Sequence, residues 1–349
     1  MTPVMSTPTE SRAPATGRPA WSRLRFHFSF PLGVCLLAFS LMVTSSAAAP
    51  PSGGLSRFTY TQYHMGVDAR LVVYAPDQAT AERVCAAAFA RIAELDTIMS
   101  DYRRNSELNR LSARAGGPPI RVSPHLFRVL QRAQLVARQS GGAFDVTIGP
   151  LIGLWRKARK SGTLPAPDEI ARARRLVGWQ KLHLDERART ARLELPGMQL
   201  DLGGIAKGYA ADVAQRTFKE RGILHALVEM GGDIVVSGAP PGTEGWTIRV
   251  PNAGTDRGPA ELHLTHRAIS TSGDTEQFAI IGGRRYSHIV DPRTGMAQTN
   301  RVQVSVIAPN GLTSDPLSTA LTILGEEDSS RLRESYPKTT TYVRVLPLD

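Results

Sequence analysis

The residues best suited to chemistry lie where an apolar strand gives way to a helix, in the segment L-D-L-G-G-I-A-K-G-Y-A-A-D at 200–212. Backbone N–H groups at a helix start have no partner within the helix, and glycines let a phosphate approach them closely. Asp201, Gly203, Gly204 and Lys207 therefore favour a site for a phosphorylated cofactor. Neither the dinucleotide-binding fingerprint nor the P-loop pattern is met, so a plain strand–helix turn is the alternative.

A second candidate lies near the end of the chain, in T-S-D-P-L-S-T-A-L-T-I-L-G at 313–325. Pro316 and Gly325 predict a helix in which Asp315 is the N-cap, Pro316 is the first helical residue and Gly325 is the stop. Asp315 and Thr319 are four residues apart, so they share a face. A carboxylate and a hydroxyl so placed could offer oxygens to Mg²⁺. The alternative is an ordinary cap and a helix-face hydroxyl.

The first 49 residues have the pattern of a targeting segment. Arginines precede the apolar run 26–43, and the small residues S-S-A-A-A-P follow it. That order is typical of a secretory signal, so we expect 1–49 to be a signal peptide and leader and 50–349 to be the exported domain. The expected location is the periplasmic side of the inner membrane, and a membrane tether formed by an uncleaved leader is the alternative.

The formal net charge of +11 raises the question of a nucleic-acid partner. Export argues against one, and aromatic residues make up only 6% of the chain, without the aromatic and basic interleaving of single-strand binders. The basic runs 155–160 and 171–175 are interpreted as solvated helix faces. Cys85 is the only cysteine after residue 49 and lies in an apolar helical series, which predicts a buried core residue and no internal disulfide.

Strand and helix patterns do not alternate regularly enough for a doubly wound sheet, so we expect an α+β fold with a mixed or antiparallel sheet and flanking helices. Periodicity and end signals place the elements as follows: strands in 58–73, helices at 80–99, at 124–140 with Ser123 as cap, and at 167–177, a hairpin at 181–195, a helix at 205–221, short strands in 225–307, two helices in 316–335 and a last strand at 340–346.

Eight segments in one order resemble the FAD:protein FMN transferase (ApbE) family. The resemblance extends from about Phe58 to Val345, and the segments are M-G at 65, S-D-Y-R-R-N-S-E-L-N-R-L at 100–111, G-G-A-F-D-V-T-I-G-P-L at 141–151, D-L-G-G-I-A-K-G-Y-A-A-D at 201–212, G-G-D-I at 231–234, T-S-G-D at 271–274, Y-S-H-I-V-D-P-R-T-G at 286–295 and S-D-P-L-S-T-A-L at 314–321.

The resemblance implies transfer of FMN from FAD to a Thr or Ser hydroxyl of another protein, with release of AMP and with Mg²⁺ as cofactor. It implies an exported or membrane-bound electron-transfer protein as acceptor, labelled in a segment such as Asp-Gly-Ala-Thr. It implies Mg²⁺ ligands at Asp315, Thr319 and the Gly204 carbonyl. His288 is the candidate general base, with Asp291 and Arg293 as neighbours that could orient it. The implied FAD contacts are Met65, Tyr102, Ala143, Phe144, Asp145, Asp201, Lys207 and Ile289.

The chain departs from the family pattern at Glu229 and Met230, where Asn and Ala are common, and at Pro316. Glu229 is expected to bring an extra acid close to a phosphate-binding centre. Two other functions stay open: hydrolysis of FAD to FMN and AMP in the same site, and a non-catalytic protein that stores FAD. Intact Asp315, Thr319 and His288 favour an enzyme.

Overall fold

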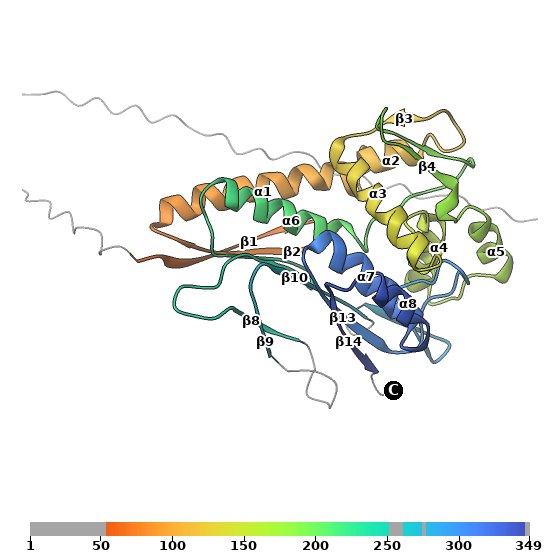
Figure 1. Ribbon diagram of the computed structural model, residues 1–349. Coiled ribbons are helices and arrows are strands. Elements are labelled where there is room, and N and C mark those ends of the chain that lie inside the picture. Colours follow the sequence, from red (N-terminus) through yellow and green to blue (C-terminus); the bar gives the residue numbers. More distant parts are fainter. Residues whose placement is uncertain (1–53, 251–260, 274–276, 346–349) are drawn as a thin grey trace, which may run out of the picture. The chain divides into compact units, whose positions relative to one another are not determined.

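The computed structural model describes residues 54–250, 261–273 and 277–345. Its main feature is a seven-stranded antiparallel sheet of order β1-β2-β6-β7-β10-β13-β14 (Figure 1). The expected leader at 1–49 lies outside the described residues. Within them, no helix combines the length and apolarity needed to span a membrane. The strands are β1 (Ser56–His64), β2 (Val67–Ala75), β6 (Ala226–Met230), β7 (Asp233–Val236), β10 (Arg267–Ser272), β13 (Val302–Ala308) and β14 (Thr340–Val345).

The sheet is covered on both faces. On one face lie α1 (Gln78–Met99), α6 (Ala206–Glu220) and α7 (Gly311–Leu324), which share one apolar core with β2, β6 and β13 (Figure 1). On the other face Trp246 of the hairpin β8 (Trp246–Arg249)–β9 (Glu261–Leu264) packs with Val72 and Leu227. Because alternate strand residues point to opposite faces, Leu71 and Val72 enter different cores.

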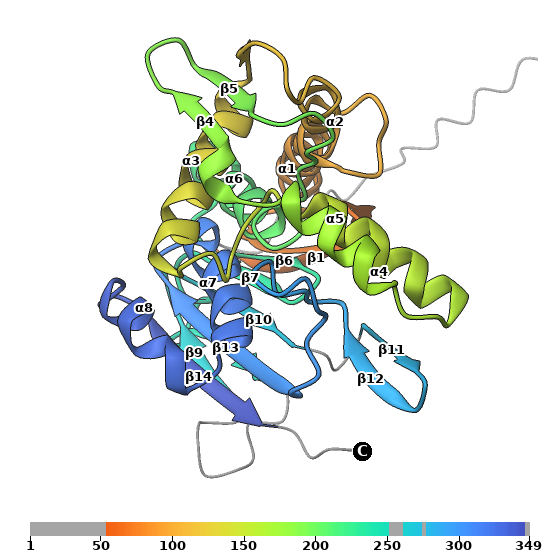
Figure 2. The same cartoon turned by 90° about the vertical axis from the view of Figure 1, so that its right-hand side faces the viewer.

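The remaining elements flank the helical layer (Figure 2). They are α2 (Glu107–Ser112), α3 (Pro124–Gln139), α4 (Gly149–Ser161), α5 (Pro167–Arg175) and α8 (Ser330–Glu334), the strands β3 (Ile120–Arg121), β4 (Leu182–Asp185) and β5 (Thr190–Leu193), the hairpin β11 (Phe278–Ile281)–β12 (Arg284–Ser287), and 3-10 turns at Trp179–Lys181 and Glu327–Ser329. The indole Nε1 of Trp155 in α4 donates to the Gly295 carbonyl at 2.9 Å, and its ring packs on Tyr286. This contact ties α4 to the loop that follows β12.

The expected fold class is confirmed, and within the described residues every pairing of named strands is antiparallel. Ser123 caps α3 by accepting from the Leu126 N–H at 3.2 Å, as predicted. Cys85 is buried in α1, and burial raises the pKa of its thiol to about 12. The hairpin expected at 181–195 is also present, as β4 and β5.

Two predictions are wrong. The helix expected to start at Pro316 begins at Gly311, so Asp315 lies inside α7 and is not its N-cap. The physical reason is a cap from another helix, the Asp212 carboxylate, which binds the first N–H groups of α7. The second is wrong in part: the run 155–160 lies in a helix, α4, and Lys157 and Lys160 are exposed, but Trp155 is buried and Arg156 is half-buried in ion pairs.

Candidate functional site

The site is built where α6 and α7 cross. A Cβ added to Gly208 of α6 would lie 2.8 Å from the Asp315 Cβ and closer still to the Gly311 carbonyl. A Cβ added to Gly311 would meet the Gly208 backbone in the same way. Only residues without a side chain allow this approach of two backbones. The two glycines therefore bring the start of α6 against the first turns of α7.

This crossing brings together the three residues expected to bind Mg²⁺. Asp315 is buried, and its Oδ2 accepts from the Gly208 N–H at 3.0 Å. The Thr319 Oγ1 lies 3.0 Å from the point where a Cβ on Gly204 would stand. Burial, together with the negative charge of Asp233, raises the pKa of Asp315 to about 7. A buried carboxylate, a hydroxyl and a backbone segment thus converge from chain positions far apart.

The donor set suits a hard divalent cation. Carboxylate, hydroxyl and carbonyl oxygens are the ligands that Mg²⁺ accepts, with water or phosphate oxygens completing its shell. No cluster of three or more His, Cys, Asp or Glu side chains able to hold a metal occurs in the described ranges. That finding is compatible with the expected set, because only Asp315 in it belongs to those residue types. The residues present therefore fit Mg²⁺.

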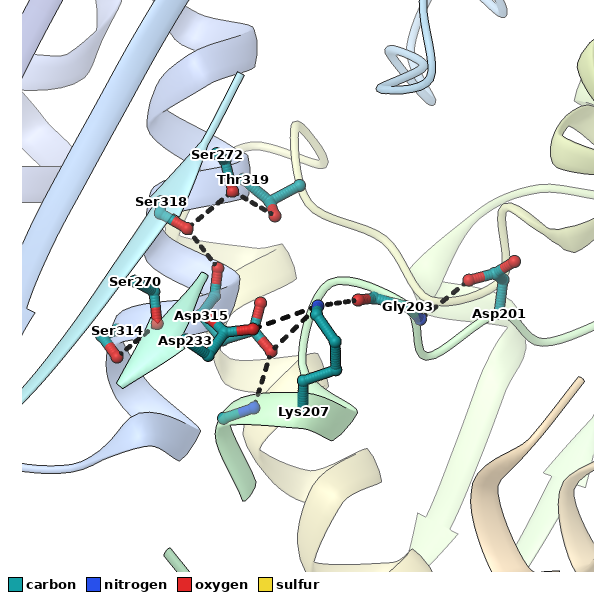
Figure 3. A network of polar contacts seen from close by, with 11 residues as sticks. Asp201, Gly203, Lys207, Asp233, Ser270, Ser272, Ser314, Asp315, Ser318 and Thr319 are labelled. Atoms are coloured by element: carbon teal, nitrogen blue, oxygen red, sulfur yellow. Dashed lines mark hydrogen bonds and ion pairs between the residues drawn. The ribbon is translucent and has the colours of Figure 1, made fainter. Parts of the chain in front are cut away.

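Lys207 lies at the centre of a polar network (Figure 3). Its Nζ donates to the Gly203 carbonyl at 2.9 Å and lies 3.1 Å from Asp233 Oδ2 and 4.0 Å from Asp315 Oδ2. Burial by itself lowers the pKa of an ammonium group, but the charges of Asp233 and Asp315 outweigh it and raise the pKa of Lys207. Lys207 is therefore a fixed positive charge beside the expected cation site.

Asp233 was missed as a site residue, although its motif G-G-D-I was noted. It is buried at the start of β7, directly after the Gly231–Gly232 turn. That turn lies against the β1–β2 turn, because a Cβ on Gly231 would stand 2.6 Å from Val67 Cγ1. Met65, a predicted FAD contact, occupies the β1–β2 turn with a φ of 52°, an uncommon conformation for a residue with a side chain. The structure thus places the Met65 turn beside the turn that leads into β7 and Asp233.

The predicted contacts Asp201 and Tyr102 are joined by Arg156. Its Nη2 donates to Asp201 Oδ2 at 3.0 Å, its Nη1 pairs with Asp101, and its guanidinium lies 4.5 Å from the centre of the Tyr102 ring. Asp201 also accepts from the Gly203 N–H at 2.8 Å. Burial and the nearby Asp101 raise the pKa of Asp201. Tyr102 as a residue is 76% exposed, which leaves its ring accessible for stacking.

The loop after α3 carries three further predicted contacts, all buried. The Phe144 ring packs against Gly204, with Cε2 3.3 Å from the Cβ position there. Ala143 lies in an apolar cluster with Ile289, another predicted contact, and Ile323 of α7. Asp145 accepts from the N–H and the hydroxyl of Thr147 at 2.8 and 2.7 Å, and burial raises its pKa. The loop therefore supports Gly204 and α7 from one side.

His288 follows β12 directly. Its Nδ1 lies 3.0 Å from the Gln277 carbonyl oxygen, which can only accept. Nδ1 therefore carries the proton in the neutral ring, and Nε2 is the basic nitrogen. Asp291 and Arg293, expected as orienting neighbours, form an ion pair with each other at 2.9 Å. The Gln277 backbone carbonyl is one contact that orients the His288 ring.

Two other residues singled out in the sequence find partners. Glu229 of β6 pairs with Arg70 of β2, whose Nε donates to Glu229 Oε2 at 2.7 Å. The extra acid expected from Glu229 is therefore balanced by Arg70. Ser272 of the T-S-G-D segment has its Oγ 2.7 Å from the Ser318 hydroxyl and 3.3 Å from the Thr319 hydroxyl. Asp274 of that segment lies outside the described residues.

Comparisons with known proteins find a family model, relatives and solved structures that match most of the chain. The model of the ApbE family matches residues 65–343. The FAD:protein FMN transferase of Vibrio cholerae is 33% identical over 247 residues, which cover 69% of this chain and 73% of that protein. A Klebsiella pneumoniae protein of the same name is 31% identical over 309 residues, covering 86% and 87%. The apo crystal structure of the Pseudomonas stutzeri flavinyl transferase ApbE superposes with a TM-score of 0.74 at 28% identity, covering 85% of this chain and 93% of that one.

Proposed function

Because the chain belongs to the ApbE family, we propose that it transfers FMN from FAD to a Thr or Ser hydroxyl of an acceptor protein, with Mg²⁺ as cofactor and AMP as the leaving group. The observation that carries the proposal is the convergence of Gly204, Asp315 and Thr319 beside the Lys207 ammonium. Positioning and neutralisation of charge dominate phosphoryl-type transfer, and this cluster supplies both.

The acceptor hydroxyl is activated by His288. Its Nε2 takes the hydroxyl proton while the Gln277 carbonyl holds the proton on Nδ1. The acceptor oxygen then forms a bond to the FMN phosphorus as the pyrophosphate P–O bond breaks, and AMP leaves with the bonding electron pair. The products are a phosphoester on the acceptor, AMP, and a protonated His288 that returns its proton to solvent.

The other residues bind and orient. Asp315, Thr319 and the Gly204 carbonyl would hold Mg²⁺, which when bound draws negative charge from the pyrophosphate. Lys207, held by Asp233, adds a second positive charge next to that centre. The exposed Tyr102 ring offers a face for a base or flavin, and Arg156 fixes its position. Met65, Ala143, Phe144, Asp145, Asp201 and Ile289 complete the proposed FAD site.

The acceptor we propose is an exported or membrane-bound electron-transfer protein, and the location is the periplasmic side of the inner membrane. The support is the basic, apolar and small-residue order of 1–49. No nucleic-acid partner is proposed.

The test is incubation of the purified protein with FAD, Mg²⁺ and a peptide that carries Asp-Gly-Ala-Thr. Flavin fluorescence on the peptide supports transfer. AMP and free FMN without labelling would indicate hydrolysis, and unchanged bound FAD would indicate storage. His288→Ala is expected to lower the labelling rate by about 10²–10⁴-fold with unchanged FAD affinity, whereas His183→Ala, which removes an exposed histidine paired with Glu194, leaves both unchanged. Equal loss of FAD binding in His288→Ala would contradict the catalytic role.

A further inference from the structure

Where α6 and α7 cross, each helix supplies a carboxylate that accepts hydrogen bonds from the backbone of the other helix. Asp212 of α6 accepts from the Gly311 N–H with Oδ1 at 2.7 Å and from the Leu312 N–H with Oδ2 at 2.8 Å. Asp315 of α7 accepts in return from the Gly208 N–H of α6. These hydrogen bonds between the helices lie around the close contact of Gly208 with Gly311.

Asp212 acts as the missing cap of α7. The first N–H groups of a helix have no partner inside it, and a local Ser, Thr, Asp or Asn usually supplies one. Asn310 occupies the N-cap position but makes no such bond, and its Oδ1 accepts from the Thr313 hydroxyl at 2.8 Å. The buried N–H groups of Gly311 and Leu312 therefore depend on Asp212 for their hydrogen bonds.

The Asp212 cap can affect the cation site because Gly204 lies just before α6, and Asp315 and Thr319 lie on α7. Asp212 follows Gly208 by four residues, about one turn of α6, and Gly204 stands two residues before the first residue of that helix. On α7, Asp315 and Thr319 follow the capped residues within the next two turns. Because Asp212 holds Gly311 and Leu312 in place, it also sets the distance between Thr319 and Gly204. That distance is short, since the Thr319 Oγ1 lies only 3.0 Å from the point where a Cβ on Gly204 would stand.

We propose that Asp212 is a positioning residue of the cation site, which sets the spacing of Gly204, Asp315 and Thr319 without contacting the cation. The inference rests on the proposed function, since it assumes that these residues bind a divalent ion. It adds a role for an acid that lies outside the expected ligand set and the expected FAD contacts.

The test measures cation affinity directly. Mn²⁺, a stand-in for Mg²⁺ whose free ion gives an EPR signal, is titrated into the purified full-length protein and its variants. We expect Asp212→Ala to weaken Mn²⁺ binding about tenfold or more. Asp212→Asn should lie between it and the unsubstituted protein, because the amide keeps a single acceptor oxygen for two N–H groups.

The matched control is Asp77→Ala, which removes the N-cap of α1, a carboxylate that accepts from the Thr80 N–H at 2.7 Å. It should lower the unfolding midpoint through the loss of a cap and leave Mn²⁺ affinity unchanged. If Asp212→Ala fails to fold, the Mn²⁺ affinity of Asp212→Asn tests the inference instead.

Three outcomes overturn the inference. If the folded Asp212 variants bind Mn²⁺ as tightly as the unsubstituted protein, Asp212 does not position the site, and the proposed function stands. An equal loss in Asp77→Ala would show that the effect is one of general stability. If the unsubstituted protein binds no Mn²⁺, the proposed cation site fails together with the inference.

Discussion

Lys207 Nζ lies 3.1 Å from Asp233 Oδ2, so an ammonium group on α6 is paired with a buried carboxylate at the start of β7. The same ammonium lies 4.0 Å from Asp315 Oδ2 on α7. Two acids this close to each other repel, and the repulsion contributes to the raised pKa of Asp315. The positive charge of Lys207 therefore offsets the repulsion between Asp233 of β7 and Asp315 of α7 at the expected cation site.

Asp233→Asn is expected to destabilise the fold. Removing the nearer acid leaves Lys207 buried with Asp315 at the longer distance, and breaking a buried pair costs about 3–5 kcal/mol in the free energy of unfolding. Lys207→Met should also destabilise, because it leaves two acids without their cation. The double variant should be less destabilised than the sum of the two, as measured by urea unfolding followed by circular dichroism. Additive losses would show that the two side chains are not coupled.

Gly208→Ala should force the two helices apart. The new Cβ would stand 2.8 Å from the Asp315 Cβ and closer to the Gly311 backbone, which cannot move aside as a flexible side chain would. We expect a loss of about 1–3 kcal/mol in the free energy of unfolding and weaker Mn²⁺ binding. The control is Gly153→Ala in α4, where a Cβ meets nothing within 4 Å; it should be neutral or stabilise by up to about 1 kcal/mol. Equal effects of the two substitutions would contradict a tight crossing.

Arg156→Met is expected to act on FAD binding. It removes the cation shared by Asp101 and Asp201 and frees the Tyr102 ring. Because Arg156 positions Asp201 and Tyr102, two proposed FAD contacts, KM for FAD should rise about tenfold, which corresponds to about 1.4 kcal/mol of binding free energy, while kcat changes little. Lys157→Met, an exposed lysine on the same helix, serves as control in the same steady-state assay. A fall in kcat at constant KM would place Arg156 in the chemical step instead.

The sequence was sufficient for the family and for the α+β class, and both are confirmed. The three residues expected to bind Mg²⁺ lie together in the structure, and their role as ligands stays a prediction. The roles of Asp212, Asp233 and Arg156 were not predicted, since each depends on a partner distant in the chain: Asp212 and Gly311 are 99 positions apart, and Arg156 and Asp201 are 45 apart. A distant partner also explains why Asp315 was wrongly predicted as the N-cap of α7. The cap comes from Asp212 on another helix, so the residues next to the helix start in the sequence do not reveal it.

The Asp212 carboxylate should make the stability of the protein depend on pH in a definite direction. Burial raises its pKa to about 6 from an ordinary value of 3.8, even though two N–H bonds act to lower it. Between these values the folded protein keeps a proton that the unfolded chain has lost, so stability falls as the pH rises through this window. Asn at this position does not titrate. The stability advantage of the unsubstituted protein over Asp212→Asn should therefore shrink by up to about 3 kcal/mol between about pH 4 and pH 7, as read from urea unfolding at both pH values. An advantage that grows with pH would mean that the two N–H bonds outweigh burial and hold the pKa below its ordinary value.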